Sequence, residues 1–347
     1  KVTEDFPYKI NAVLLKNQYQ KKLGIDMTTS YDSGENLPTS FFDKVVPADS
    51  TNEYLGGVID DMPVTDRAEN VATFSEYARN KGINLVYFHH PGKFGSNAVY
   101  KDYSAEKLEE IRHIMDDKNV DSVFFDDYMP ADRDEYARMF YRTDHHWLPS
   151  TGLMADRILC EHLNDKCGYS IDTSYFDVDK YDIKKIDQPF LGTWGQRVTE
   201  VYTKPEPFEI YYPKYHTDLT VYNSRYDETR TGTLEETLYD YSLLDGGLYD
   251  ESKYHMYGLG NIAYCSIHNN DIHDGSRILM LSTSYAYVMF PFLCTAVEDI
   301  DVIDLRYFNG SIQSFIEDKK PDTIILVYGT SSYVRSGDNR EKTFDFH

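Results

Sequence analysis

The stretch RILMLSTSYAYVMFPFL, residues 277–293, decides the fold of this chain. Its apolar residues 278–281 have the composition of a buried strand, which ends abruptly in small hydroxyl residues and leads into a mostly apolar helix. Pro291 should kink that helix or end its first part. Ligands of parallel α/β sheets bind beyond the carboxyl ends of strands. Ser284 therefore stands where chemistry is expected, although a simple helix N-cap also explains a serine here.

Helices and strands alternate on both sides of this stretch. Four further apolar runs have the length of buried strands: residues 83–88, 120–125, 300–304 and 323–328. Helical patterns accompany them, beginning at Glu69, Ser104, Pro149 and Ser311. This alternation is the signature of a parallel sheet covered by helices.

The pattern of apolar, polar and turn residues divides the chain into four parts. Residues 1–67 lack a sustained period and are predicted to form an irregular arm, with a Gly/Ser/Asn-bearing stretch at 33–40. Residues 68–169 and 273–347 carry the α/β pattern. In residues 170–272, short Tyr-rich runs alternate with turn residues, which indicates an insertion of β hairpins and loops.

The charge of the chain excludes one class of partner. Asp and Glu number 58 against 35 Lys and Arg, so the net charge is −23. A surface of this sign repels phosphate backbones, so we expect no nucleic-acid partner. The 31 tyrosines suit a sugar-binding cleft, but packing in half-buried strands is the favoured explanation for them.

The apolar runs, the first residues and the cysteines of the chain indicate in which cellular compartment the protein works. No apolar run approaches the roughly 20 residues that cross a bilayer. Because the sequence opens without Met, we expect that an export signal or anchor has been removed and that the protein is extracellular or at the cell surface. Cys160 and Cys167 lie close enough in sequence for a short-loop disulfide, and two buried thiols explain them equally well. The absence of a CxxC pair argues against structural zinc.

The segment RTDHHW, residues 142–147, carries the second chemical signal. A nucleophilic hydroxyl needs a base, usually His, and a carboxylate that fixes the tautomer of that base. Asp144 and His146 are two residues apart in a turn before a helix, so both can converge on one serine, whereas His145 should point away.

Two other interpretations of this segment remain open. An Asp-His-His motif also ligates metal in manganese-dependent phosphoesterases. The pairs at 89–90 (His-His) and 126–127 (Asp-Asp) would then supply further ligands. The third interpretation is a cluster of mutually satisfied polar groups.

Five segments together resemble the bacterial DHHW family, which is similar to the SGNH-like domains of alginate O-acetylation proteins. They are GINLVYFHHPGK (82–93), RTDHHW (142–147), YGLGN (257–261), RILMLSTSYAYVMFPFL (277–293) and DVIDLRYF (301–308). The resemblance covers residues 69–328, with a poor match in the Tyr-rich middle. It implies a three-layer, flavodoxin-like SGNH core with a parallel sheet and a Tyr-rich β insertion.

The resemblance also implies a catalytic triad of Ser284 as nucleophile, His146 as base and Asp144 as orienting group, in a permuted order. The chain departs from the family pattern at Ser282 and Thr283, which stand where Gly or Lys and Asp are usual. Ser282 adds a Cβ where the backbone needs room, which bears on the oxyanion geometry. Candidate oxyanion or substrate contacts are Gly192, Thr283, Tyr285, Thr330 and Arg306, and Lys93 is a candidate for an anionic substrate.

Three functions follow from these residues. The first is a serine O-acetyltransferase or acetylesterase that acts on polysaccharide without a metal or organic cofactor, with a membrane-bound partner that delivers the acyl group. The second is a degenerate SGNH domain that binds polysaccharide. The third is a metal-dependent phosphoesterase.

Overall fold

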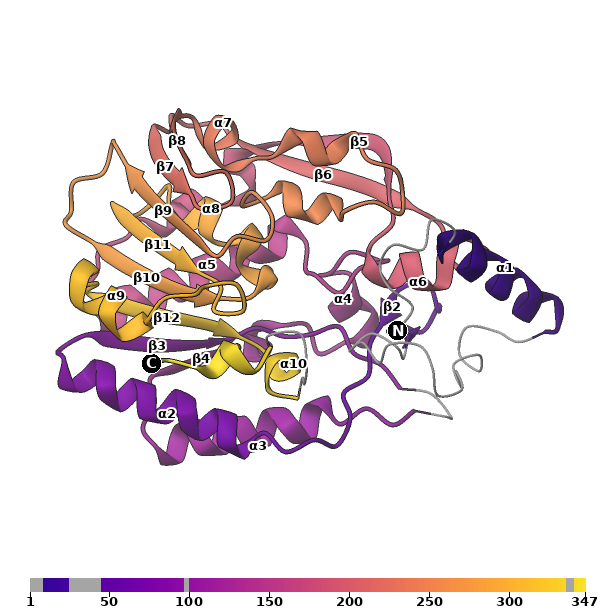
Figure 1. Ribbon diagram of the computed structural model, residues 1–347, viewed down its shortest axis with the longest axis horizontal. Helices are drawn as coiled ribbons and strands as arrows, with labels where there is room; N and C mark the ends of the chain where they lie inside the picture. Colours follow the sequence, from indigo (N-terminus) through magenta and orange to yellow (C-terminus); the bar gives the residue numbers. More distant parts are fainter. Residues whose placement is uncertain (1–8, 25–44, 97–99, 335–339) are drawn as a thin grey trace.

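The computed structural model describes residues 9–24, 45–96, 100–334 and 340–347. Its centre is an eight-stranded sheet (Figure 1). The strands are, in spatial order, β4 (Ser122–Phe124), β3 (Asn84–His89), β12 (Thr323–Tyr328), β10 (Arg277–Ser282), β11 (Asp299–Ile303), β9 (Tyr264–Asn269), β7 (Leu219–Asn223) and β8 (Glu228–Gly232). The first five strands are parallel, as the α/β pattern predicts.

Two apolar layers cover the sheet, because its central strands are buried on both faces. In β12, Ile325 and Val327 join the core cluster on one face, whereas Ile324 and Leu326 join the cluster on the other. The first face packs against α5 (Pro149–Lys166) and α8 (Phe290–Leu293). The second packs against α2 (Thr65–Asn80), α3 (Ser104–Asp117) and α9 (Ile312–Lys319), of which α2 and α3 lie together below the sheet in Figure 1.

The Tyr-rich region contributes strands both to the main sheet and outside it. β9 pairs antiparallel with β11, and β7 and β8 continue the sheet as antiparallel strands. β5 (Tyr181–Phe190) and β6 (Glu206–Pro213) form a separate two-stranded sheet. The short helices of this region are α6 (Thr193–Tyr202), α7 (Leu234–Leu238), η2 (Thr173–Phe176), η3 (Val178–Lys180), η4 (Tyr241–Leu244) and η5 (Lys253–Met256).

The N-terminal arm is more regular than its sequence predicts. It contains α1 (Lys9–Lys22) and the paired strands β1 (Val46–Pro47) and β2 (Leu55–Gly56). A long-range contact fixes α1, since the buried Asn17 amide donates to the carbonyl oxygens of Arg197 and Val198. Apolar periodicity could not reveal a helix held this way. The Gly/Ser/Asn-bearing stretch at 33–40 lies outside the described residues.

The remaining elements are helices of four or five residues. They are η1 (Phe125–Tyr128), α4 (Arg133–Ala137), η6 (Ser284–Val288), α10 (Thr330–Tyr333) and η7 (Arg340–Phe344). All four cysteines are free thiols, so Cys160 and Cys167 form no disulfide. Within the described ranges, no helix has the length and apolar character needed to cross a membrane.

Candidate active site

Ser284 lies at the carboxyl end of a central strand. β10 ends at Ser282, Thr283 is extended, and Ser284 opens the 3-10 helix η6. Met289, two residues before Pro291, ends η6 and caps the start of α8, so the predicted break in the helix lies just before the proline. Ser284 is half-buried between buried neighbours. Its hydroxyl therefore stands at the sheet edge where α/β proteins bind ligands.

A continuous hydrogen-bonded chain joins Ser284, His146 and Asp144. His146 Nε2 lies 2.8 Å from Ser284 Oγ, and His146 Nδ1 lies 2.6 Å from Asp144 Oδ1. Because a carboxylate accepts at Nδ1, the neutral ring carries its proton there and leaves Nε2 as an acceptor for the serine hydroxyl. The side chains at 282 and 283 therefore do not keep Ser284 from its imidazole partner.

The Asp144 carboxylate is fully buried and held by donors on both oxygens. Oδ1 also accepts the backbone N–H of His146 at 2.9 Å, and Oδ2 accepts the N–H of Thr193 at 2.6 Å. Burial alone raises the pKa of the Asp144 carboxyl, but the rings of His145 and His146 and the N–H donors hold that pKa well below its usual value. Asp144 therefore stays ionised and fixes the His146 ring.

Gly192 supports this carboxylate at close range. Its N–H donates to Thr143 Oγ1 at 2.9 Å, so it is already engaged and is not directed at an acyl oxygen. A Cβ on Gly192 would lie 2.2 Å from the Cβ of Asp144. Thr143 is held in turn by Glu206, whose Oε1 accepts the Thr143 hydroxyl at 2.7 Å, and burial raises the pKa of Glu206.

Tyr254 is a site residue that sequence reasoning missed. Its ring stacks on His146 with centroids 3.8 Å apart and an interplanar angle of 11°. Its hydroxyl donates to the carbonyl oxygen of Ser284 at 3.0 Å. Tyr254 thus covers the imidazole and holds the start of η6. The only signal in the sequence was the general abundance of tyrosine in residues 170–272.

The prediction that His145 points away from the site is wrong. Its ring packs on His146 with centroids 3.8 Å apart, and its Nδ1 lies 3.4 Å from Asp144 Oδ1. Asp144, His145 and His146 therefore form a group whose ligand atoms are close enough to hold a metal ion. Both ring nitrogens of His146 already face partners, so an ion bound there would replace one of those hydrogen bonds.

The other predicted contacts lie at different distances from this centre. Tyr285 is buried, and its hydroxyl donates to the His145 carbonyl oxygen at 2.8 Å. Thr283 is buried beside Ser284, and its hydroxyl makes no hydrogen bond to any residue that the structure describes. Arg306 pairs with Asp304 through hydrogen bonds of 2.9 and 3.1 Å from Nε. Thr330 Oγ1 lies 3.2 Å from a different imidazole, that of His89.

Lys93 lies inside the protein and does not face solvent. It is 1% exposed and donates to the carbonyl oxygens of Tyr141 and Arg142. Its ammonium group stands 5.2 Å from the centroid of the Trp194 ring. Burial lowers the pKa of Lys93 to about 7. This placement suits a link between segments better than contact with a substrate.

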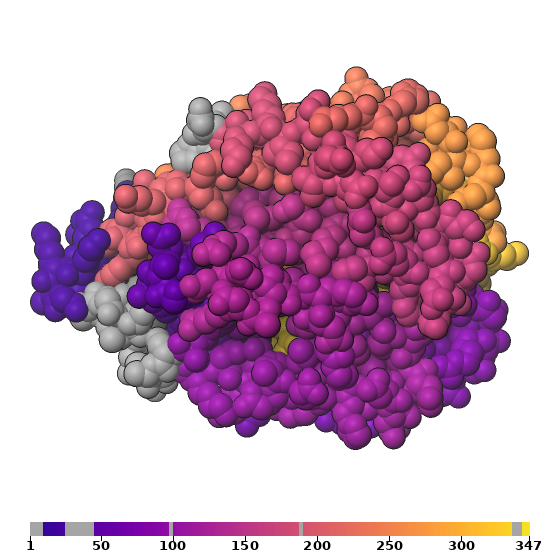
Figure 2. Space-filling model, turned by 180° about the vertical axis from the view of Figure 1, so that it is seen from behind, coloured from indigo at the N-terminus to yellow at the C-terminus, as the bar shows by residue number. Residues whose placement is uncertain are grey.

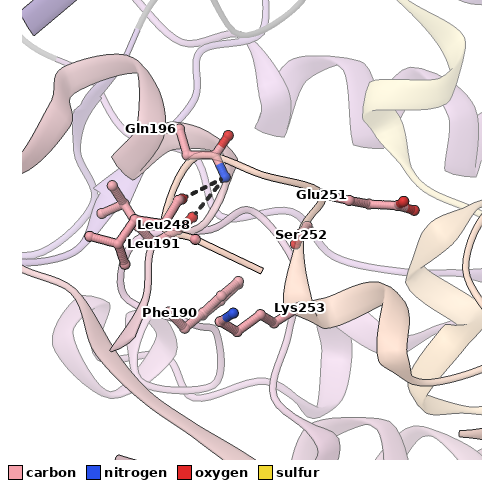
Figure 3. Close-up of a pocket in the computed structure, with 8 residues that line it drawn as sticks. Phe190, Leu191, Gln196, Leu248, Glu251, Ser252 and Lys253 are labelled. Carbon is pink, nitrogen blue, oxygen red and sulfur yellow. Dashed lines mark hydrogen bonds between the residues drawn. The ribbon is translucent and has the colours of Figure 1, made fainter. Parts of the chain in front are cut away.

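The loop before η5 is tied to α6 (Figure 3). Gln196 donates from its amide to the carbonyl oxygens of Leu191 and Leu248, both at 3.1 Å. Lys253 donates to two carbonyl oxygens of the loop at 244–246. These bonds join the segment that carries Gly192 to the segment that carries Tyr254.

Solved structures with a similar fold include three bacterial proteins. PatB1 from Bacillus cereus is 15% identical, with a TM-score of 0.68, over 87% of this chain and 99% of that chain, and it is also known with a sulfonyl adduct. A DHHW family protein from Eubacterium siraeum is 19% identical, with a TM-score of 0.60, over 87% and 98% of the two chains. The O-acetyltransferase domain of Pseudomonas putida AlgJ is 11% identical, with a TM-score of 0.51, over 84% and 93%.

These structures confirm the predicted three-layer α/β fold of SGNH type. No protein of curated function matches the sequence. The family model of the DHHW protein matches residues 102–303, which is more than half of the chain. The matched range includes Asp144, His146 and Ser284. The chain therefore belongs to the DHHW family.

Proposed function

We propose that this protein is a serine O-acyltransferase or acetylesterase that acts on polysaccharide through an acyl-Ser284 intermediate. The observation that carries the proposal is the unbroken chain from Ser284 Oγ through His146 to the ionised Asp144. Hydroxyl, imidazole and carboxylate in this order are what nucleophilic acyl transfer requires.

In the first half-reaction, Ser284 Oγ attacks the carbonyl carbon of an acyl ester, and its proton moves to His146 Nε2. The tetrahedral intermediate collapses when the C–O bond to the leaving alcohol breaks, and His146 returns the proton to that alcohol. Asp144 stabilises the imidazolium that exists between the two steps. The product is an ester of Ser284.

In the second half-reaction, a hydroxyl group resolves the acyl-serine. His146 removes the proton of a sugar hydroxyl or of water, whose oxygen attacks the acyl carbon. The bond to Ser284 Oγ then breaks, and Ser284 recovers its proton from His146. A sugar acceptor makes the protein a transferase, and water makes it an esterase.

Two donors beside Ser284 can stabilise the oxyanion. The N–H of Ser284 opens η6 and belongs to the first N–H groups of a helix, which lack an intrahelical acceptor. The buried Thr283 hydroxyl, unpaired among the described residues, is the second. Because η6 spans only five residues, we assign this role to individual donors and not to a helix macrodipole.

The setting of this activity follows from the comparisons and remains part of the proposal. AlgJ contains an O-acetyltransferase domain, and acetylation of surface or secreted polysaccharide would place this protein outside the cytoplasm. A membrane-bound partner would then supply the acyl group, because acetyl donors are made inside the cell.

The proposal is tested by trapping the intermediate. The protein is incubated with 4-nitrophenyl acetate or a sulfonyl fluoride, and its intact mass is measured together with nitrophenol release. We expect one adduct per chain on Ser284, and a loss of turnover of at least about 1,000-fold in Ser284→Ala. Ser314→Ala, which removes an exposed serine on α9, is the matched control.

Two results would overturn the proposal. A wild-type protein that forms no adduct and releases no nitrophenol, but binds polysaccharide, is a binding domain. Activity that requires added metal and disappears with a chelator would assign Asp144, His145 and His146 to an ion.

A further inference from the structure

A second hydroxyl, imidazole and carboxylate lie in line at the same sheet edge. Thr330 Oγ1 is 3.2 Å from His89 Nε2, and His89 Nδ1 is 2.6 Å from Asp126 Oδ2. Thr330 follows β12 as Ser284 follows β10, and these two strands are neighbours. The first set belongs to the proposed active site, and the second has no role in it.

This second set opens on a cavity of about 230 Å³. Asp126 and Thr330 line it together with the apolar side chains of Phe94, Ala105 and Leu108. The residues that line the cavity come from the segment 92–136 and from Thr330 near the C-terminus. Figure 2 shows a hollow in the purple and magenta face, with yellow atoms of the C-terminal part at its floor. A volume of this size holds one ring with its substituents and no more.

The hydroxyl groups that line the cavity donate their protons to other protein atoms. The lining therefore offers mainly hydrogen-bond acceptors to a ligand. Ser104 donates its hydroxyl to Asp102, whose other oxygen accepts the N–H of Ile59 at 2.7 Å. Tyr136 donates its hydroxyl to the Gly92 carbonyl oxygen at 2.9 Å.

Thr330 and Asp126 continue the same pattern. Because the Asp126 carboxylate accepts at His89 Nδ1, the tautomer with its proton on that nitrogen leaves Nε2 to accept the Thr330 hydroxyl. Lone pairs of the Thr330 oxygen then remain free. Asp126 Oδ1 makes no hydrogen bond within the part of the chain that the structure describes. A lining of acceptors selects a ligand rich in donors and repels carboxylates and phosphates.

We propose that this cavity binds one uncharged or amino-sugar unit of the acceptor polysaccharide. A sugar ring offers an apolar C–H face to Phe94 and Leu108 and a rim of hydroxyl donors to Asp126 and Thr330. The carboxylates of the lining, in a protein of net charge −23, exclude uronic-acid chains. The identification of the ligand as a sugar rests on the proposed function.

The cavity is a neighbour of the triad but is separate from it. The His90 ring stacks on Tyr285 with centroids 3.8 Å apart, and these two residues directly follow His89 and Ser284 in the chain. A polymer with one unit in the cavity could therefore present another unit to the acyl-serine. The cavity would select the glycan, and the triad would perform the transfer.

The test measures binding in a protein that cannot turn over. Fully N-acetylated chitohexaose and cellohexaose are titrated into Ser284→Ala by calorimetry, with an oligogalacturonate as the anionic comparison. We expect the neutral oligomers to bind and the uronate not to. Asp126→Asn should weaken binding about tenfold, because it replaces a charged acceptor by an amide. Ala105→Phe should abolish binding by filling the cavity, whereas His113→Phe, an exposed position farther along α3, should not change it.

Each alternative outcome contradicts the proposal. Equal binding of the uronate removes the charge argument, and undiminished binding in Ala105→Phe places the sugar elsewhere. An oligolysine peptide that displaces the sugar with equal affinity would assign the cavity to a cationic peptide. Because no turnover is needed, these results are independent of whether wild-type protein forms the Ser284 adduct.

Discussion

At the scale of single residues, the site is organised around one buried carboxylate. Asp144 accepts from the His146 ring, from the His146 backbone and from Thr193, so its position is set by several donors at once. Gly192 lets the backbone of α6 come this close, because a hydrogen occupies the place where a side chain would meet Asp144. The orientation of the base is therefore determined by a residue that never touches Ser284.

Gly192→Ala tests this arrangement. The new Cβ would lie 2.5 Å from Asp144 Oδ2, so the carboxylate must move and the His146 ring with it. We expect acyl-ester turnover to fall on the order of 100-fold, and stability to fall by about 1–3 kcal/mol from overpacking. Steady-state kinetics and urea unfolding measure the two effects.

Gly246→Ala is the matched control, because its Cβ would meet the side chain of Asp250 at 3.3 Å and the Leu243 carbonyl oxygen at 3.7 Å, which is an ordinary contact distance. Unchanged kcat in Gly192→Ala would show that the base tolerates displacement of its carboxylate. A pH profile of kcat/KM that shifts in Gly192→Ala, but not in Gly246→Ala, would show that the effect acts through His146.

At the scale of elements, Ser284 depends on close contact between two helices. In α5, Gly152 faces η6 so closely that a Cβ would lie 1.9 Å from the carbonyl oxygen of Val288. On the opposite side, Tyr254 of η5 holds the Ser284 carbonyl oxygen. The short helix that begins with the nucleophile is thus held between α5 and the Tyr-rich insertion.

Gly152→Ala should separate α5 from η6. The clash involves backbone atoms, which cannot rotate away, so we expect a loss of stability of about 1–3 kcal/mol. We also expect the rate of adduct formation on Ser284 to fall by more than tenfold, because the serine moves with η6. Glu161→Ala, on the exposed side of α5, should change neither quantity. If the adduct formed at the normal rate in Gly152→Ala, Ser284 would not depend on this contact.

Part of this architecture could be predicted from sequence, because the burial of some segments is visible in the pattern of their own neighbouring residues. The apolar strands 278–281 and 323–328 and the hydroxyl block at Ser284 carry such patterns. The Tyr-rich alternation shows that strands exist but not which edge they pair with, so the continuation of the sheet through β7, β8 and β9 was hidden. Tyr254 and Gly192 act through partners far away in the chain, and no local period marks them.

At the scale of the whole molecule, the site is assembled where distant segments meet. Lys93, just after β3, donates to the segment before Asp144 and lies near the aromatic rings of Tyr54 and Trp194. It thereby connects the N-terminal strands, the DHHW segment and α6. The division of the chain at residues 67, 169 and 272 stays a prediction, since this link joins parts on both sides of two of those boundaries.

Lys93→Met tests how far this link governs global stability. Burial lowers the pKa of Lys93 to about 7, whereas an unfolded lysine titrates near 10.4. Between these values the unfolded chain binds a proton that the folded chain does not, so the contribution of Lys93 to stability grows as the pH rises and is lost as the pH falls through 7.

One such proton changes the free energy of unfolding by at most about 1.4 kcal/mol per pH unit. Urea unfolding at pH 7 and pH 9 should show this gain in wild-type protein and in Lys118→Met, which alters an exposed lysine, but not in Lys93→Met. An equal rise in all three proteins would mean that Lys93 keeps its proton in the folded state and connects the segments as a buried cation.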